Sequence, residues 1–446
     1  MGDLFGTDGI RGIAGEDLTG DLARRIGRAT AMVFRAHGEE RPRVLVGRDT
    51  RASGVELEAA LAEGFCSAGC DVLLAGVQTT PAVAFLTVDA GASSGVVISA
   101  SHNPPEYNGI KMFGPEGYKL SDQLEAEIER LVGENESESP DDGEGSAIAL
   151  EDATDRYIAH LVSAAETSLD GLSVVVDAAN GASAVEAPET LRRLGAAVEA
   201  IGDAPDGANI NVECGAMHPE VMAALVRKRG ADAGVAHDGD ADRAIFADAS
   251  GALVDGDHVL AACALALKER GRLAGGRVVS TVMANLGFHE AMREAGIEVV
   301  TTKVGDRFVL EEMLRTGAVI GGEQSGHIIF REHASTGDGI LTAVKLLTLA
   351  RDAGKPLAQF VDVMRRYPQV LENVRVWNRE GLEDATDVWD AVRAAEQAMG
   401  ETGRVLVRAS GTEPLVRVMV EAQTDEEART HADAIAEAVR RSIGAP

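Results

Sequence analysis

The sequence is poor in aromatic residues and in lysine, and it has no long apolar run. Phe, Trp and Tyr together make up 4% of the 446 residues, which argues against an aromatic platform for single-stranded nucleic acid. Seven residues are lysine, and the formal net charge of -30 disfavours binding to nucleic acid and to anionic membranes. No apolar stretch is long enough to span a bilayer. We therefore expect neither nucleic acid nor a membrane as a partner.

Cysteine is also scarce, and the chain begins without the pattern of a secretory signal. The first residues have no basic stretch followed by an apolar one, so no signal peptide is expected. The four cysteines are Cys66, Cys70, Cys214 and Cys263. Cys66 and Cys70 are four positions apart in a helical pattern, which we interpret as core packing rather than a metal pair. These features predict a cytoplasmic protein in a reducing environment.

The length and the distribution of polar residues predict several domains. A chain of 446 residues is long enough for three or four domains, and 45% hydrophobic residues can fill their cores. The acidic segment GENESESPDDGEGS at 133–146 has the composition of a linker or exposed loop. Composition changes again near residue 251 and near residue 367. We predict domains over 1–150, 151–251, 252–366 and 367–446.

Short apolar strands alternate with helical stretches through most of the chain, which predicts α/β units. Three of these units end in an unusual polar loop, and equivalent positions would bring the three loops into one cleft. The last 80 residues instead predict strand, helix, strand, strand and helix, the order of a small α+β domain. The predicted strands that carry this argument are 44–46, 71–74, 96–99, 110–113, 174–177, 233–236, 278–281, 318–320, 370–377, 404–408 and 415–421.

The first polar loop follows the β-branched run Val-Val-Ile at 96–98. It has the sequence Ser-Ala-Ser-His-Asn-Pro at 99–104, and two consecutive prolines prevent the strand from continuing. Ser101 is therefore expected on a sharp loop at a strand end, where α/β proteins commonly place chemistry. No Gly-x-Ser-x-Gly sequence surrounds it, which argues against an acyl-transfer serine. An ordinary polar turn and a serine that carries a phosphoryl group both fit the residues.

The second polar loop alternates carboxylates with small residues. Asp238, Asp240 and Asp242 follow an apolar strand, and three oxygens from one loop suit a hard divalent cation. A calcium EF-hand is excluded, because its sixth and twelfth positions would be Arg243 and Ala249 instead of Gly and Glu. A solvated acidic loop is the alternative.

Two further loops and the N-terminal segment predict contacts with polar groups of a ligand. Gly-Glu-Gln-Ser-Gly-His at 322–327 offers a carboxylate and a hydroxyl that sugar hydroxyls could bind, although Gly-rich turns with Glu are common. Arg408 and Arg417 flank a Ser-Gly-Thr turn that could form an anion nest, in a chain of net negative charge. Three glycines surround Arg11, which suggests backbone near an anion or an ordinary Gly-rich turn.

The hexapeptide at 99–104 resembles the phosphoserine loop of the α-D-phosphohexomutases. The segments 5–12, 238–243, 322–327 and 408–414 resemble, in the same order, the N-terminal signature, metal loop, sugar loop and phosphate loop of that family. The resemblance covers essentially the whole chain. It implies α/β architecture with four domains: three similar α/β domains with mixed sheets and a C-terminal α+β domain.

The resemblance also implies roles for individual residues. Ser101 would carry the phosphoryl group, and its phosphate together with Asp238, Asp240 and Asp242 would hold one Mg²⁺. Lys111, the end of Asn-Gly-Ile-Lys at 108–111, would act as acid or base. Further catalytic candidates are Arg11 and His102. Substrate contacts are implied for Arg243, Asp306, Glu323, Ser325, His327, Arg408, Ser410, Gly411, Thr412 and Arg417.

Members of this family move a phosphoryl group between O6 and O1 of a sugar through a sugar 1,6-bisphosphate, which is both intermediate and activator. The loop at 322–327 and Val-Gly-Asp-Arg at 304–307 resemble the branch that interconverts glucosamine 6-phosphate and glucosamine 1-phosphate. A phosphomannomutase or phosphoglucomutase is the alternative. The partner is then a small sugar phosphate, and a homodimer is compatible with the resemblance.

Two alternatives from other classes fit less well. A non-catalytic sugar-phosphate sensor would be expected to lose Ser101 or the aspartates, and all are present. A hydrolase of the alkaline phosphatase type would need histidine-rich ligand sets, which His102 and His237 alone do not supply.

Overall fold

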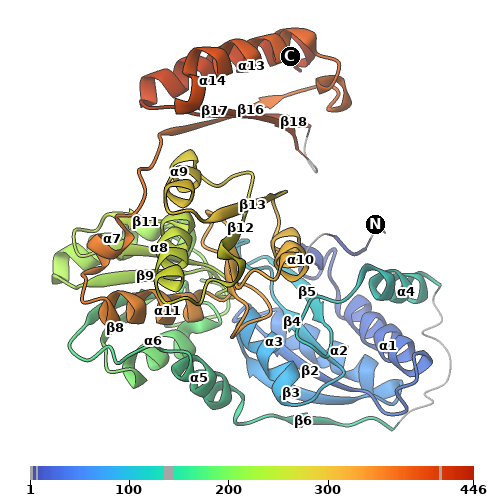
Figure 1. Ribbon diagram of the computed structural model, residues 1–446. Helices are drawn as coiled ribbons and strands as arrows, with labels where there is room; N and C mark the ends of the chain where they lie inside the picture. Colours follow the sequence, from blue (N-terminus) through green and yellow to red (C-terminus); the bar gives the residue numbers. More distant parts are fainter. Residues whose placement is uncertain (1–3, 7–8, 135–143, 411–413, 446) are drawn as a thin grey trace. The chain divides into compact units, whose positions relative to one another are not determined.

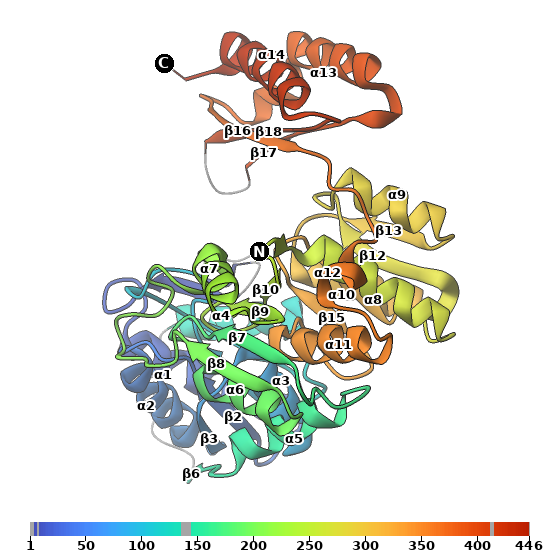
Figure 2. The same cartoon turned by 90° about the vertical axis from the view of Figure 1, so that its left-hand side faces the viewer.

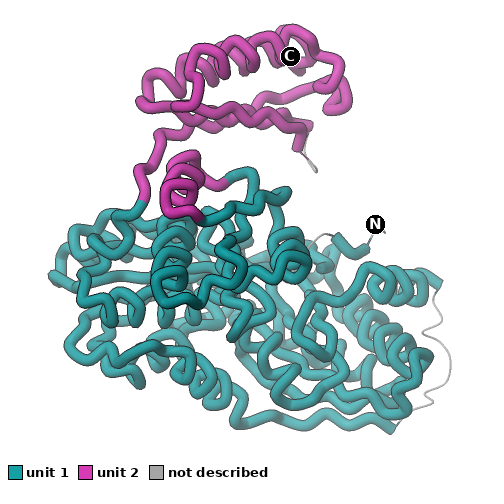
Figure 3. The backbone as a smooth tube through the Cα atoms, viewed as in Figure 1, with its two compact units in different colours: residues 1–283, 297–363 teal, residues 284–296, 364–446 magenta. Residues whose placement is uncertain are grey.

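The chain forms two compact units, which Figure 3 shows in different colours. The computed structural model describes residues 4–6, 9–134, 144–410 and 414–445. The first unit comprises residues 1–283 and 297–363, and the second comprises 284–296 and 364–446. No helix within the described residues is long and apolar enough to cross a membrane.

The first unit begins with a six-stranded mixed sheet of order β1-β5-β4-β2-β3-β6 (Figure 1). Strands β4, β2, β3 and β6 are parallel neighbours, whereas β5 runs antiparallel to both β4 and β1. The bounds are β1 Ile10–Ile13, β2 Arg43–Arg48, β3 Asp71–Val77, β4 Ser94–Ile98, β5 Tyr107–Phe113 and β6 Ala147–Ala149, with helices α1 Gly20–Ala36, α2 Gly54–Ser67, α3 Thr80–Asp89 and α4 Asp122–Gly133.

Side chains of this sheet alternate between two cores, as the two-residue period of a strand requires. Val46 and Ile98 pack with residues of α1, α2 and α4 on one face. Leu45 and Val97 pack with residues of α3 on the other face. Both faces are covered, so the strands read as continuous apolar runs rather than as an apolar and polar alternation.

Two further mixed sheets belong to the first unit. Their orders are β11-β10-β9-β7-β8 and β13-β12-β14-β15. The strands are β7 Ser173–Asp177, β8 Ala197–Ile201, β9 Ala233–His237, β10 Ala244–Asp248, β11 Leu253–Val254, β12 Arg277–Thr281, β13 Glu298–Thr302, β14 Ile320–Gly322 and β15 Ile328–Phe330. The helices are α5 Ala153–Ser163, α6 Ser183–Arg193, α7 Pro219–Arg229, α8 Gly256–Glu269, α10 Asp306–Thr316, α11 Gly339–Asp352 and α12 Leu357–Val361, with short 3-10 helices Gly215–Met217 and Ala274–Gly276.

The three sheets share one local arrangement at the polar loops. In each sheet a central strand, β4, β9 or β14, pairs antiparallel with the next strand of the chain, β5, β10 or β15. The connecting segments hold Ser101, the three aspartates and Glu323, respectively. The prediction of three similar α/β units with mixed sheets is therefore confirmed.

The second unit is a three-stranded antiparallel sheet of order β16-β18-β17 with helices on one face (Figure 2). Helices α13 and α14 share a core with the strands. Glu421 is fully buried and accepts hydrogen bonds from Asn285 Nδ2 and from the backbone N–H of Leu286, so α9 packs within this unit. The bounds are α9 Leu286–Glu294, β16 Gln369–Arg375, α13 Thr386–Met399, β17 Arg404–Ala409, β18 Leu415–Glu421 and α14 Asp425–Ile443, with short 3-10 helices Glu380–Leu382 and Gly400–Thr402.

Besides small shifts at strand ends, one helix and one strand differ from the sequence prediction. Cys66 and Cys70 do not share a helix, because α2 ends at Ser67 and Gly69 adopts a left-handed backbone with φ of 79°. The strand predicted at 318–320 begins at Ile320 instead and extends to Gly322. The predicted domain boundaries at 150, 251 and 366 stay predictions.

Candidate active site

The serine loop places Ser101 in a strained and buried position. Strand β4 ends at Ile98, and Ser101 follows with a φ of 51° and a side chain that is almost fully buried. A left-handed backbone costs an ordinary residue of order 1–2 kcal/mol. The loop therefore depends on its surroundings to keep the serine in this conformation.

A buried ion pair beneath the loop supplies much of that support. Asp49 and Arg51 follow β2, the parallel neighbour of β4, and Arg51 Nε lies 2.9 Å from Asp49 Oδ2. Both side chains are 0% exposed. The Arg51 guanidinium donates hydrogen bonds to the carbonyl oxygens of Ser101 and Asn103, each at 2.9 Å, and to that of Pro104. One side chain thus binds three carbonyls of the loop.

Ser99 links the ion pair to the backbone of Ser101. Its hydroxyl donates to Asp49 Oδ2 at 2.6 Å and accepts from the Ser101 N–H at 3.0 Å. Burial raises the pKa of Asp49, while the charge of Arg51 and the hydrogen bond from Ser99 act in the opposite direction. Asn211, which follows β8 in the chain, donates a 2.9 Å hydrogen bond to the Ser101 carbonyl oxygen.

The aspartate loop lies directly against the serine. Ser101 Oγ donates a hydrogen bond of 2.8 Å to Asp238 Oδ2. One oxygen each of Asp238, Asp240 and Asp242 lies within 4.8 Å of the others, and all three residues are buried. The alternative of a solvated acidic loop is therefore wrong. The loops that follow β4 and β9 are therefore in contact, as the sequence predicts.

The three carboxylates fit a divalent cation. The Oδ1 atoms of Asp240 and Asp242 are buried and have no hydrogen-bond partner among the described residues. Buried carboxylate oxygens without partners are costly in a protein unless a cation or water binds them. An all-oxygen donor set from one short loop suits a hard cation such as Mg²⁺.

Electrostatics within the loop point the same way. Burial, followed by the charges of Asp242 and Asp240, raises the pKa of Asp238 well above its usual value. Burial and the charge of Asp242 raise the pKa of Asp240 to about 6. Burial also opposes ionisation of Asp242, but the charges of His327 and Arg243 outweigh it and lower that pKa. Such clustering of negative charge is unfavourable without a compensating cation.

The loop at 322–327 adjoins Lys111 and Asp306. Lys111 lies on β5 with 7% exposure, and its Nζ is 3.9 Å from Asp306 Oδ2. Lys111 is therefore not a surface residue. Glu323 Oε1 accepts from the Gly305 N–H at 3.1 Å, which joins the loop at 322–327 to the segment at 304–307. His327 is 2% exposed, and neither of its ring nitrogens has a hydrogen-bond partner among the described residues.

The remaining predicted site residues of the first unit are His102, Arg243, Arg11 and Ser325. His102 Nδ1 is 3.2 Å from Ser101 Oγ, so this histidine contacts the Ser101 hydroxyl. Arg243 Nε lies 3.7 Å from Asp242 Oδ1. Arg11 is exposed on β1, opposite Gly109, and its charge favours ionisation of Asp240 and Asp242. Ser325 is exposed.

In the second unit, two arginines face each other across neighbouring strands. Arg408 on β17 pairs directly with Arg417 on β18. Like charges in this position are unfavourable. Burial, with the charge of Arg417, lowers the pKa of Arg408. Ser410 is buried, its carbonyl accepts from Arg379 Nη1 at 2.9 Å, and a bound anion would offset the three positive charges. Gly411 and Thr412 lie outside the described residues.

Sequence reasoning missed several residues that support the site, among them Asp49, Arg51, Asn211 and Thr80. One signal could have identified the first two. The run Val-Gly-Arg-Asp-Thr-Arg at 46–51 ends a predicted strand in charged residues, at the same edge of the sheet where the serine loop begins. Asn211 and Thr80 carry no such pattern.

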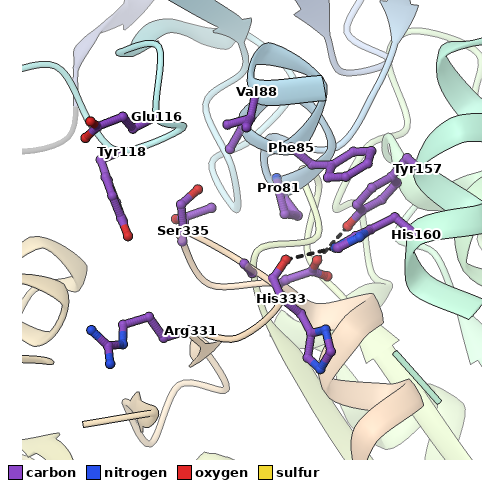
Figure 4. A pocket seen from close by; sticks show the side chains of 14 residues that line it. Pro81, Phe85, Val88, Glu116, Tyr118, Tyr157, His160, Arg331, His333 and Ser335 are labelled. Carbon is purple, nitrogen blue, oxygen red and sulfur yellow. Dashed lines mark hydrogen bonds between the residues drawn. The ribbon is translucent and has the colours of Figure 1, made fainter. Parts of the chain in front are cut away.

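A cavity of about 200 Å³ lies next to α3, α5 and the segment before α11 (Figure 4). Phe85 stacks on His160 with ring centroids 4.2 Å apart, and both side chains are labelled in Figure 4. His160 contacts the carbonyl of His333 at 2.8 Å, and the Tyr157 hydroxyl donates to Asp338 at 2.8 Å. Burial lowers the pKa of both histidines. The residues that line this cavity do not include Ser101, Lys111 or the aspartates of the loop at 238–242.

Comparison with known proteins identifies the family. Four profiles described as phosphoglucomutase/phosphomannomutase match in order: alpha/beta/alpha domain I at residues 2–139, domain II at 155–251, domain III at 255–367 and the C-terminal domain at 371–438. Together they cover most of the chain.

Curated relatives are similar over nearly their full length. A phosphoglucosamine mutase of Desulforamulus reducens is 51% identical over 442 residues, covering 98% of this chain and 99% of the relative. A phosphoglucosamine mutase of Pelotomaculum thermopropionicum is 54% identical over 424 residues, covering 94% and 95%.

Solved structures share the fold. A phosphoglucomutase/phosphomannomutase family protein of Burkholderia thailandensis has a TM-score of 0.83 at 28% identity and covers 98% of this chain and 97% of its own. An Aspergillus fumigatus N-acetylphosphoglucosamine mutase has a TM-score of 0.69 at 18% identity, with 98% and 96% covered. With the four profiles, the full-length relatives and the serine and aspartate loops in contact, the chain belongs to the phosphoglucomutase/phosphomannomutase family and is a phosphohexomutase.

Proposed function

We propose that this phosphohexomutase interconverts glucosamine 6-phosphate and glucosamine 1-phosphate through a phosphorylated Ser101. The contact between Ser101 Oγ and Asp238, at 2.8 Å inside a buried cluster of carboxylates, is the observation that carries the phosphoserine. The choice of glucosamine rests on curated phosphoglucosamine mutases that are 51% and 54% identical over nearly the whole chain.

The proposed reaction has two phosphoryl transfers. In the first, the bond between phosphorus and Ser101 Oγ breaks, a bond from phosphorus to the free sugar hydroxyl forms, and glucosamine 1,6-bisphosphate results. The intermediate then turns over, and its other phosphoryl group returns to Ser101 Oγ. Each cycle therefore restores the phosphoserine and leaves one phosphate on the sugar.

Side chains around Ser101 have distinct proposed tasks. Lys111 accepts the proton of the attacking sugar hydroxyl and returns it in the second transfer, with Arg11 assisting. Asp306, 3.9 Å from Lys111 Nζ, holds the amine in place. His102, 3.2 Å from Ser101 Oγ, is positioned to contact the leaving oxygen.

Asp238, Asp240 and Asp242 are proposed to hold one Mg²⁺ together with an oxygen of the Ser101 phosphate. When bound there, the cation would offset negative charge on the oxygens of the transferring group. Arg243, beside Asp242, is proposed to bind that same phosphoryl group because a guanidinium matches its geometry.

The two ends of the substrate would be recognised by separate loops. Glu323, Ser325 and His327 are proposed to bind sugar hydroxyls that both orientations of the intermediate present. Arg408, Ser410, Gly411, Thr412 and Arg417 are proposed to bind the phosphate that is not transferred. Binding energy from this remote phosphate would orient the reacting end.

A coupled assay on three sugars tests the proposal. The purified chain is given glucosamine 1-phosphate, glucose 1-phosphate or mannose 1-phosphate, each with its 1,6-bisphosphate, and the 6-phosphate is measured. The highest kcat/KM is expected for glucosamine 1-phosphate, and Ser101→Ala is the inactive control. An equal or higher kcat/KM for glucose or mannose 1-phosphate would instead identify a phosphoglucomutase or phosphomannomutase.

A further inference from the structure

Thr80 makes two hydrogen bonds to Asp240, and both come from a part of the chain outside the metal loop. The Thr80 hydroxyl donates to Asp240 Oδ2 at 2.6 Å, and the Thr80 N–H donates to the Asp240 carbonyl at 3.0 Å. Thr80 is 0% exposed and Asp240 is 3% exposed. These contacts are therefore shielded from water, where hydrogen bonds to a charged group contribute more than at a surface.

The position of Thr80 follows from the start of α3. Thr79 caps this helix by accepting from the Ala82 N–H at 3.3 Å, and a proline follows Thr80. The first N–H groups of a helix have no partner within the helix. The N–H of Thr80 donates to the metal loop instead. Similarly, the N–H of Gly339 at the start of α11 donates to the Ala241 carbonyl at 2.9 Å.

These contacts leave the two oxygens of Asp240 unequal. Oδ2 is engaged by Thr80, whereas Oδ1 is buried and has no hydrogen-bond partner among the described residues. The carboxylate can thus offer a cation one oxygen freely. To bind with both oxygens, it would have to share Oδ2 between the cation and the 2.6 Å hydrogen bond from Thr80, which would weaken that bond.

We propose that Thr80 is a positioning residue that keeps Asp240 a one-oxygen ligand and so makes the metal site favour Mg²⁺ over Ca²⁺. The inference rests on the metal site of the proposed function. Mg²⁺ requires near-octahedral geometry at about 2.0–2.1 Å, whereas Ca²⁺ takes 6–8 oxygens and readily accepts a carboxylate through both oxygens. A carboxylate whose second oxygen is held elsewhere suits the smaller ion.

Calorimetric titration of the full-length, chelator-treated chain with Mg²⁺ and with Ca²⁺, carried out with Ser101 dephosphorylated and with Ser101 phosphorylated, tests the proposal. Thr80→Val removes the hydroxyl at nearly constant volume, and Thr80→Ser retains it. Thr87→Val is the matched control, because Thr87 lies buried on the same helix and its hydroxyl donates to the Val83 carbonyl at 2.7 Å, away from the loop. Melting temperatures of all four proteins are measured alongside.

Thr80→Val is expected to weaken Mg²⁺ binding by roughly 10–100-fold and Ca²⁺ binding by less, which lowers the ratio of the two affinities. Thr80→Ser and Thr87→Val should keep the wild-type ratio. If Thr80→Val keeps the wild-type ratio of the two affinities and the wild-type protein binds Mg²⁺, the role of Thr80 is overturned but the metal site is not. Absence of Mg²⁺ binding by the wild type would overturn the metal site of the proposed function as well. If Thr80→Val does not fold, Thr80→Ala removes the same hydroxyl without adding bulk, and the same outcomes apply.

Discussion

Arg51 donates a 2.9 Å hydrogen bond to the backbone carbonyl of Ser101 from within a fully buried ion pair with Asp49. Ser101 has a φ of 51°, which a serine adopts only when its surroundings enforce it. The guanidinium also binds the carbonyls of Asn103 and Pro104. The conformation of Ser101 is therefore stabilised by a residue that lies 50 positions earlier in the chain.

Replacing Arg51 is expected to reduce both stability and turnover. Arg51→Met leaves Asp49 buried without its partner, and such a loss costs about 3–5 kcal/mol. The loop carbonyls also lose their donors, so kcat should fall by more than tenfold. Thermal unfolding and the coupled assay measure the two effects. The double variant with Asp49→Asn should recover part of the stability but little of kcat, and full recovery of kcat would show that the ion pair only maintains the fold.

Removing Arg417 is expected to affect binding and chemistry together. Arg417→Ala should raise KM and also lower kcat, because a poorly held distal phosphate misorients the reacting end. Steady-state kinetics measure both parameters. Arg393→Ala is the control, since its side chain is 63% exposed and paired with Asp390 one helical turn away. Unchanged kinetics in Arg417→Ala would contradict the proposed phosphate site.

Glu186 should make the stability of the first unit depend on pH. Its carboxylate is buried, and burial, with the charge of Asp338, raises its pKa from 4.5 to about 8, although hydrogen bonding with Thr79 acts in the opposite direction. The unfolded chain releases this proton near its ordinary pKa and the folded chain does not. The folded state thus loses stability as pH rises from 4.5 to about 8, by at most roughly 5 kcal/mol.

Glu186→Gln removes that titration while keeping the shape of the side chain. Its melting temperature should match the wild type near pH 4.5 and exceed it near pH 8. Differential scanning calorimetry at several pH values measures the difference. A difference between the two proteins that does not change with pH would show that Glu186 is already ionised in the folded state.

Much of this site could be predicted from local sequence. Ser101 and the three aspartates each follow an apolar strand, and equivalent strands place their loops together, as the 2.8 Å contact between Ser101 and Asp238 confirms. Burial of Lys111 could not be read from its neighbours, because it depends on the pairing of β5 with both β4 and β1. The contacts of Thr80 with Asp240 join residues 160 positions apart and leave no local pattern.

The backbone conformation of one glycine explains why a helix ends earlier than its pattern predicts. The helical pattern over Cys66 and Cys70 predicts core packing, which the structure confirms, but Gly69 takes a left-handed conformation and the helix ends before Cys70. The paired arginines on β17 and β18 were both identified, yet their direct opposition required the register of the sheet. Sequence patterns within one segment therefore predict site residues, whereas contacts that depend on strand pairing cannot be read from them.

Removing divalent cations should abolish most turnover. Asp238, Asp240 and Asp242 are buried close together, so without a cation these carboxylates repel one another and the incoming phosphate. Exhaustive chelation is expected to lower activity by orders of magnitude, and Mg²⁺ should restore it. Asp240→Asn, which is nearly isosteric, should keep the wild-type melting temperature while Mg²⁺ restores little activity. Full activity after chelation would contradict the metal site.

The most direct measurement follows the phosphoryl group on Ser101. The chain is incubated with glucosamine 1,6-bisphosphate, freed of small molecules and examined by intact mass and by peptide mapping, then mixed with glucosamine 6-phosphate. One phosphate is expected on Ser101 and none in Ser101→Ala, and an isotopically labelled phosphate on Ser101 should pass to the sugar while each completed cycle restores a phosphate on Ser101. A Ser101→Ala variant that still turns over, or a phosphate on Ser101 that passes only to water, would contradict this mechanism.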